Sequence, residues 1–78
     1  MIGMRPEQIV IAEEQFERLR PTLVTKYPDQ YIVIDPISKE YWIDPVSSVA
    51  LKKATNMFPG RNFYLKKIGA DTAFSFTG

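Results

Sequence analysis

The chain contains no cysteine and no histidine among its 78 residues. Without thiols it forms no disulfide, and without thiols or imidazoles it lacks the usual ligands of zinc and the commonest general base. No apolar run approaches the roughly 18 residues that mark a membrane span, and no basic segment followed by an apolar stretch indicates a signal peptide. These absences predict a cytoplasmic protein that has no cofactor and no contact with a membrane.

The length suits a single domain, 1–78, built around one hydrophobic core. A hydrophobic fraction of 45% and a charged fraction of 24% are typical of a globular chain. The net charge of +1 divides into −3 over residues 1–49 and +4 over residues 50–78. We expect the two halves either to attract one another in the fold or to present a basic surface to an acidic partner.

Two segments have the periodicity of amphipathic helices. Pro6 and Glu7 are typical of a helix start, and apolar residues then recur at spacings of three and four up to Leu23. Pro21 is expected to kink this helix or to begin a short second one. A second apolar stripe over 50–58 predicts another helix, which Ser47 or Ser48 would cap.

Three segments are predicted strands, and a fourth is a candidate. The segment 31–35 (YIVID) carries large apolar groups on both faces, which is typical of a central strand. The short connection to 40–44 (EYWID) predicts an antiparallel hairpin. Residues 62–68 give the third strand, and 73–76 give the possible short fourth. The pattern Ile-Asp-Pro-Ile/Val-Ser, at 34–38 and again at 43–47, predicts that two strand ends share one turn chemistry.

The order helix, strand, strand, helix, strand predicts an α+β domain. A right-handed crossover makes the second and third strands parallel, so the first strand lies between them and antiparallel to both. We expect a two-layer sandwich in which both helices cover one face of the sheet and the other face stays partly open.

Several motifs resemble a group of small, uncharacterised stand-alone proteins common in cyanobacteria and archaea, classed as a domain of unknown function. These motifs are Phe16 with Leu23 and YPxxYIVID over 27–35, A-x3-A-x3-FP over 50–59, and FYxxxIG over 63–69. The similarity spans 13–76 and departs from the family at Asp35-Pro36, where a glycine-containing turn is more usual. The resemblance implies an αββαβ fold, a prokaryotic cytosol and no established activity, with an antitoxin-like partner role as a suggestion of class.

Catalysis has few candidate residues in this chain. Asp35 and Asp44 are the obvious carboxylate pair, yet Asp-Pro is ordinary turn chemistry, and opposite ends of antiparallel strands need not be close. Each of the four glycines stands alone, so no phosphate-binding loop is present. The sequence therefore predicts that the protein is not an enzyme.

The main prediction is a protein-interaction module, whose partner is another protein or a second copy of the chain. Ten aromatic residues are more than a two-layer fold of this size can bury, and an open sheet face would display Tyr31 or Trp42 to a partner. The alternative is that these two side chains complete the core.

Weak nucleic-acid binding is the second hypothesis. Basic and aromatic residues are interleaved in the C-terminal half: Lys52, Lys53, Arg61, Tyr64, Lys66 and Lys67. Such a surface would hold phosphates and stack bases. Alternatively, lysines at this place protect a sheet edge from aggregation, and Lys66 and Lys67 are predicted to lie on opposite faces of their strand.

Overall fold

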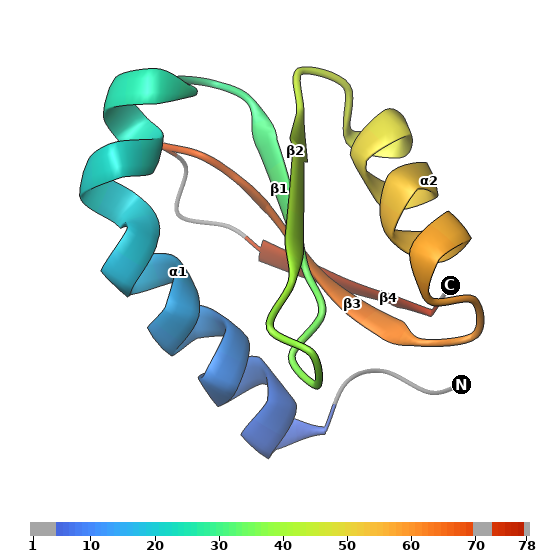
Figure 1. The fold of residues 1–78 in the computed structure, drawn as a ribbon. Helices are drawn as coiled ribbons and strands as arrows, with labels where there is room; N and C mark the ends of the chain where they lie inside the picture. The colour runs from blue at the N-terminus through green and yellow to red at the C-terminus, as the bar shows by residue number, and fades with distance from the viewer. Residues whose placement is uncertain (1–4, 70–72, 78) are drawn as a thin grey trace.

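The computed structural model describes residues 5–69 with their side chains and the backbone of 73–77. The elements follow one another as α1 (Pro6–Lys26), β1 (Tyr31–Ile34), β2 (Tyr41–Asp44), α2 (Ser47–Met57), β3 (Asn62–Lys67) and β4 (Ala73–Thr77) (Figure 1). The predicted α+β class and αββαβ order are confirmed, and the possible fourth strand is present. Within the described ranges, no helix has both the length and the apolar character needed to cross a membrane.

The four strands form one sheet in the order β2-β1-β3-β4. β1 is antiparallel to both of its neighbours, with Val33 opposite Trp42 on β2 and Leu65 on β3. β4 is antiparallel to β3 and forms the far edge of the sheet. The predicted central place of the first strand is therefore confirmed, and β2 and β4 are the two edges.

The two helices cover opposite faces of this sheet, so the predicted two-layer sandwich with both helices on one face is wrong in this respect (Figure 1). Ile32 and Ile34 belong to the cluster beneath α1, whereas Val33 belongs to the cluster beneath α2. All three are fully buried. Successive side chains of a strand point to opposite faces, and an apolar face left in water is unfavourable, so each face needs its own helix.

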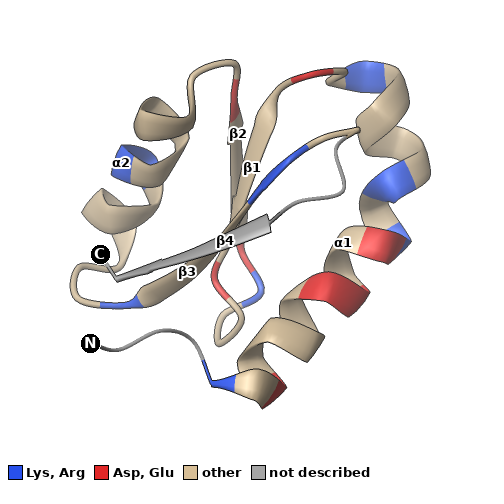
Figure 2. Cartoon of the chain, turned by 180° about the vertical axis from the view of Figure 1, so that it is seen from behind, with Lys and Arg blue, Asp and Glu red and all other residues tan. Residues whose placement is uncertain are grey.

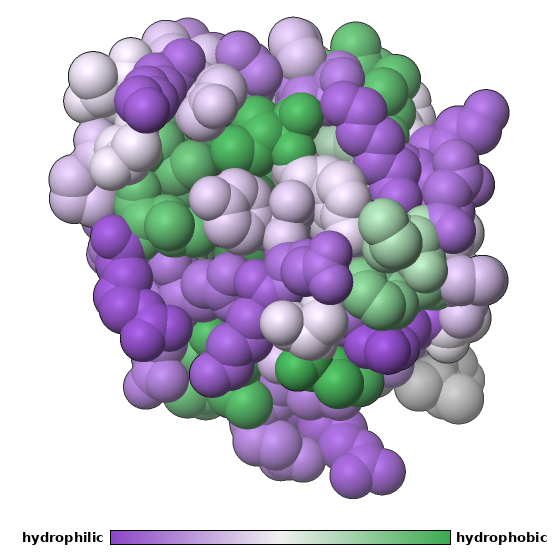
Figure 3. Space-filling model, viewed as in Figure 1, coloured by the Kyte–Doolittle hydropathy of each residue, from purple (hydrophilic) through white to green (hydrophobic). Residues whose placement is uncertain are grey.

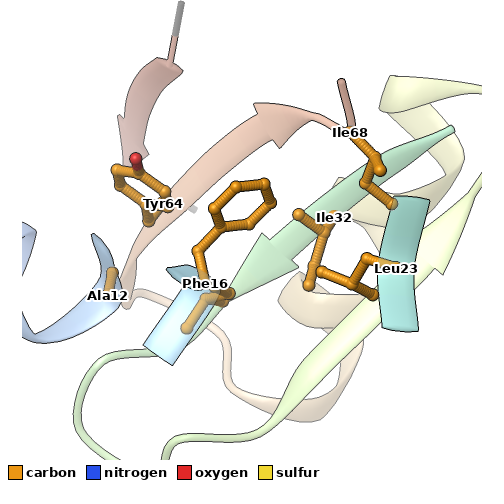
Figure 4. Packing of buried hydrophobic residues seen from close by; sticks show 7 residues of the cluster. Ala12, Phe16, Leu23, Ile32, Tyr64 and Ile68 are labelled. Atoms are coloured by element: carbon orange, nitrogen blue, oxygen red, sulfur yellow. The ribbon is translucent and has the colours of Figure 1, made fainter. Parts of the chain in front are cut away.

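The α1 face is closed by the apolar stripe that the sequence predicts. Ala12, Phe16 and Leu23 pack against residues of β1 and of the β3 segment, including Ile32 and Ile68 (Figure 4). The helix continues through Pro21 without starting anew, and the Thr25 hydroxyl donates a hydrogen bond to the Pro21 carbonyl at 3.0 Å.

The α2 face has small residues in the helix and aromatic residues around it. Ala50 and Ala54 are fully buried, which lets the helix approach Phe63 closely. Trp42 meets Phe63 edge to face at 6.3 Å between ring centroids, and it meets Phe58 in the same way at 6.0 Å. Neither serine caps the helix, because the residue at the N-cap is Val46.

The turn of the β1–β2 hairpin places Lys39 in the left-handed region, at a φ of 66°. Its amide donates to the Asp35 carbonyl at 2.7 Å, and its own carbonyl accepts a hydrogen bond from the Gln15 side chain of α1 at 2.6 Å. Lys39 takes part in both bonds through its backbone only, so its side chain is not required. A residue with a Cβ is strained in this conformation, whereas glycine is not.

Replacing Lys39 with glycine should therefore leave the fold intact and raise the free energy of unfolding by about 0.5 kcal/mol, since relief of strain exceeds the added entropy of the unfolded chain. Urea unfolding measures this change. Lys39→Ala is the matched control, because it removes the same side chain and keeps the Cβ. Equal stability of the two variants would show that this backbone conformation is not strained.

Candidate functional site

The two Asp-Pro motifs use the same local chemistry, as the sequence echo predicts. The Asp35 carboxylate accepts the amide of Ile37 at 3.2 Å, and the Asp44 carboxylate accepts the amide of Val46 at 2.9 Å. Each aspartate thus fixes a turn by binding the amide two residues further on. The Val46 amide, and then Lys53, lower the pKa of Asp44.

Asp35 is also the buried member of an ion pair with the partly exposed Arg61. Its Oδ2 lies 2.6 Å from Nη1 of Arg61 and accepts a hydrogen bond from the Ser38 hydroxyl at 2.9 Å. No part of Asp35 is exposed, and the Arg61 guanidinium stands 4.5 Å from the centre of the Phe58 ring. The pair ties the end of β1 to the start of β3, so Asp35 is engaged in the fold.

The structure does not bring the two aspartates together as a pair for acid–base work. Asp44 lies opposite Tyr31 at one end of the hairpin. At the other end, the backbone amide of Asp35 donates a hydrogen bond to the backbone carbonyl of Glu40. Four residues of strand separate the two ends, which is about 13 Å. In the described part of the chain, no group of three or more acidic residues is placed to hold a metal ion.

Two surface hollows lie on α1, away from both aspartates. The larger, of about 480 Å³, is open and is lined by Val10, Glu13, Glu14, Glu17 and Arg18. The smaller, of about 280 Å³, lies near the end of the helix around Pro21 and Thr25. Their open shape encloses no small molecule, since ligand sites bury most of a ligand's surface.

The basic residues of the C-terminal half are spread over α2 and both ends of the β3 segment (Figure 2), and their side chains do not all lie on one surface. Lys66 lies over the Phe16 ring on the α1 face, whereas Lys67 lies over the Tyr31 ring on the α2 face. Lys53 pairs with Asp44 at 3.1 Å, and Arg61 is bound to Asp35. Lys52 is exposed on α2.

Tyr64 cannot serve as a stacking platform, because it is 2% exposed beneath α1 (Figure 4). Its hydroxyl donates to Oε2 of Glu13 at 3.4 Å. Burial, and then the negative charge of Glu13, raise the pKa of Tyr64 to about 12.

Tyr31 and Trp42, the predicted partner-binding residues, both pack against the cluster beneath α2 and are partly buried. In the part of the chain that the structure describes, no open sheet face displays them, which favours the alternative that they complete the core. The neighbouring Tyr41, on the other side of β2, is 43% exposed and was not among the predicted residues. Its exposure follows from the sheet order, because a central first strand makes the second strand an edge.

The unpaired side of β2 is the surface that we call the β2 edge. The Asp35 amide donates a hydrogen bond to the Glu40 carbonyl at 2.9 Å, so Asp35 and Glu40 form a hydrogen-bonded pair of the β1–β2 ladder. In an antiparallel pair, hydrogen-bonded positions alternate with non-bonded ones, so Trp42 and Asp44 direct their amides and carbonyls to β1. Tyr41 and Ile43 direct theirs away from it. Within the described ranges, no strand pairs with this side of β2.

Comparison of the chain with models of protein families, with curated proteins and with solved structures finds no match. The candidate site therefore rests on geometry alone, and the resemblance drawn from the sequence motifs stays an expectation.

Removal of Arg61 should strongly destabilise the protein, because it leaves the buried Asp35 carboxylate without its charged partner. We expect Arg61→Met to lower the free energy of unfolding by about 2–4 kcal/mol. Lys53→Met is the matched control, since it breaks the exposed pair at the equivalent aspartate and should leave the urea midpoint nearly unchanged. Equal effects of the two substitutions would contradict this account.

Alkaline pH should destabilise the protein through Tyr64. The raised pKa means that the folded state holds the phenol proton more tightly than the unfolded state does. This contribution is complete below the ordinary tyrosine pKa of about 10 and is lost as the pH rises towards about 12. Tyr64→Phe should therefore lose less stability than the wild type between pH 9 and pH 11.5 in urea titrations. An identical loss in both proteins would contradict the assignment.

Proposed function

We propose that the protein is a non-catalytic interaction module that binds an extended segment of a partner protein along the β2 edge. The observation that carries the proposal is that, among the described residues, no strand pairs with the outer side of β2, whose outward amides and carbonyls belong to Tyr41 and Ile43. Such a row of groups accepts an added strand through main-chain hydrogen bonds.

The strand Tyr41–Asp44 contains neither the lysine nor the proline with which natural sheets often protect an edge. β2 lies nearest the viewer between the two helices, and polar and apolar groups are interspersed over this side of the molecule (Figures 1 and 3).

Some side chains of β2 hold the strand against the core, and one remains exposed for contact with a partner. Trp42 packs against Phe58 and Phe63, so it holds β2 on the α2 face. Ile43 packs against the α1 cluster, and Tyr41 beside it remains 43% exposed. An incoming strand would place its own side chains next to Tyr41, whose large amphipathic ring is of the kind that interfaces favour. A partner held in this way is consistent with the antitoxin-like role that the resemblance implies.

The substitution Tyr41→Pro tests the proposal, because it deletes one outward amide and leaves the ladder to β1 intact. Peptides selected on the wild-type protein from a displayed random library should lose at least tenfold in affinity on this variant, as measured by fluorescence polarisation. Proline is tolerated on an edge strand where its nitrogen faces solvent, so the fold should persist.

Tyr41→Thr is the matched control, since it removes the ring and keeps the amide. We expect it to lose clearly less peptide affinity than Tyr41→Pro does, because the main-chain bonds remain while the ring contact is lost, and the urea midpoint should confirm that both variants fold. Selected peptides that bind Tyr41→Pro as well as the wild type would place the recognition surface elsewhere and overturn the proposal.

A further inference from the structure

Resting on that proposed function, we propose that the segment bound at the β2 edge carries two basic residues four positions apart, with apolar residues flanking the central position. The pattern is basic, apolar, any residue, apolar, basic. It follows from the charges at the two ends of β2 and from the alternation of side chains along it.

An acidic side chain stands at each end of this edge. Glu40, directly before the strand, is exposed, and its backbone is bound to Ser38 and Asp35. Asp44, the last residue of β2, pairs with Lys53 at 3.1 Å, and its side chain is 19% exposed. Both lie on the same face of the sheet as Trp42, because side chains two residues apart in a strand share a face.

An antiparallel strand that bonds to the outward groups of Tyr41 and Ile43 is thereby fixed in register. Its central residue lies opposite Trp42, and the two residues beside the centre lie next to Tyr41 and Ile43. Those two positions favour apolar side chains. The residues two positions from the centre face Glu40 and Asp44, where opposite charges across the strands stabilise pairing and like charges oppose it.

A second copy of the chain is a poor occupant of this edge. The antiparallel arrangement that satisfies both outward amides sets Glu40 of one copy opposite Asp44 of the other, twice over. None of the ten basic residues in the sequence stands four positions from another, so the chain does not contain the complementary pattern. The geometry therefore points to a segment of a different protein.

A blocked synthetic peptide of eleven residues, with Lys-Val-Thr-Val-Arg at its centre, tests the pattern. Its control carries Glu-Val-Thr-Val-Glu at the same place. At 50 mM salt, nuclear magnetic resonance titration should show at least tenfold tighter binding of the basic peptide, with the largest shifts at the amides of Tyr41 and Ile43. Failure of the basic peptide to bind, or equal binding of the two peptides, would overturn the inference.

Reversing the charge of Glu40 on the protein is a second test of the inference. Glu40→Lys should weaken the basic peptide about three- to tenfold and strengthen the acidic one. Glu14→Lys is the matched control, because it makes the same change of net charge on the exposed side of α1 and should leave the affinity within about twofold. Equal effects of the two reversals would mean that general attraction to an acidic surface causes the binding, which contradicts the inference.

Tyr41→Pro separates this inference from the proposed function. If peptides bind in a manner that depends on the Tyr41 amide but not on charge, the edge remains the binding surface and only the basic pattern fails. If the basic peptide binds Tyr41→Pro undiminished, while library-selected peptides still depend on the Tyr41 amide, the inference alone fails. A dimer by sedimentation that Tyr41→Pro dissociates would identify a second copy as the occupant and overturn the inference.

Discussion

The structure depends on the need to cover both faces of a central strand. Ile32 and Ile34 point one way and Val33 points the other, and all three are fully buried. Each face therefore requires its own apolar cover, which α1 supplies with long side chains such as Phe16 and α2 supplies with two alanines and an aromatic surround. The small side chains of Ala50 and Ala54 leave space in this cluster, and Trp42 packs against it from β2. Both faces of β1 are thereby covered, and within the described residues no strand pairs with the outer side of β2.

The second structural feature is an Asp-Pro turn, which occurs once after β1 and once at the end of β2. Asp35 and Asp44 each follow an isoleucine, precede a proline and bind the amide two residues further on. Their surroundings then make them different. Asp35 is inaccessible to solvent and bound by Arg61, so it links the hairpin to the third strand, whereas Asp44 is partly exposed and its bond to Lys53 joins β2 to α2. The same five-residue pattern thus yields one buried link and one surface link.

The sequence predicts what local physics determines. A strand with large apolar groups on both faces had to be central, the helical stripes identified the core residues of α1, and the repeated Asp-Pro motif indicated two similar turns. Alternation shows that both faces of β1 are apolar, but it does not say which helix covers which face, and that was the point predicted wrongly. The buried Gln15 donates its side-chain amide to the carbonyl of Lys39, 24 residues away, and Asp35 meets Arg61 across 26 residues. Such contacts exist only after the chain has folded.

The same reasoning locates the candidate site at the rim of the sheet. Of the residues that the sequence singled out, Tyr64 belongs to a core cluster and Trp42 packs against the other. Asp35, Asp44, Lys53 and Arg61 have partners within the fold. The side chains of these six residues are therefore engaged within the fold. The main chain of Tyr41 and Ile43 is different, because unpaired amides and carbonyls accept a strand whatever its side chains are. In our proposal, selectivity comes from the side chains along β2 and from the acidic residues at its two ends, Glu40, which is exposed, and Asp44, which shares its charge with Lys53.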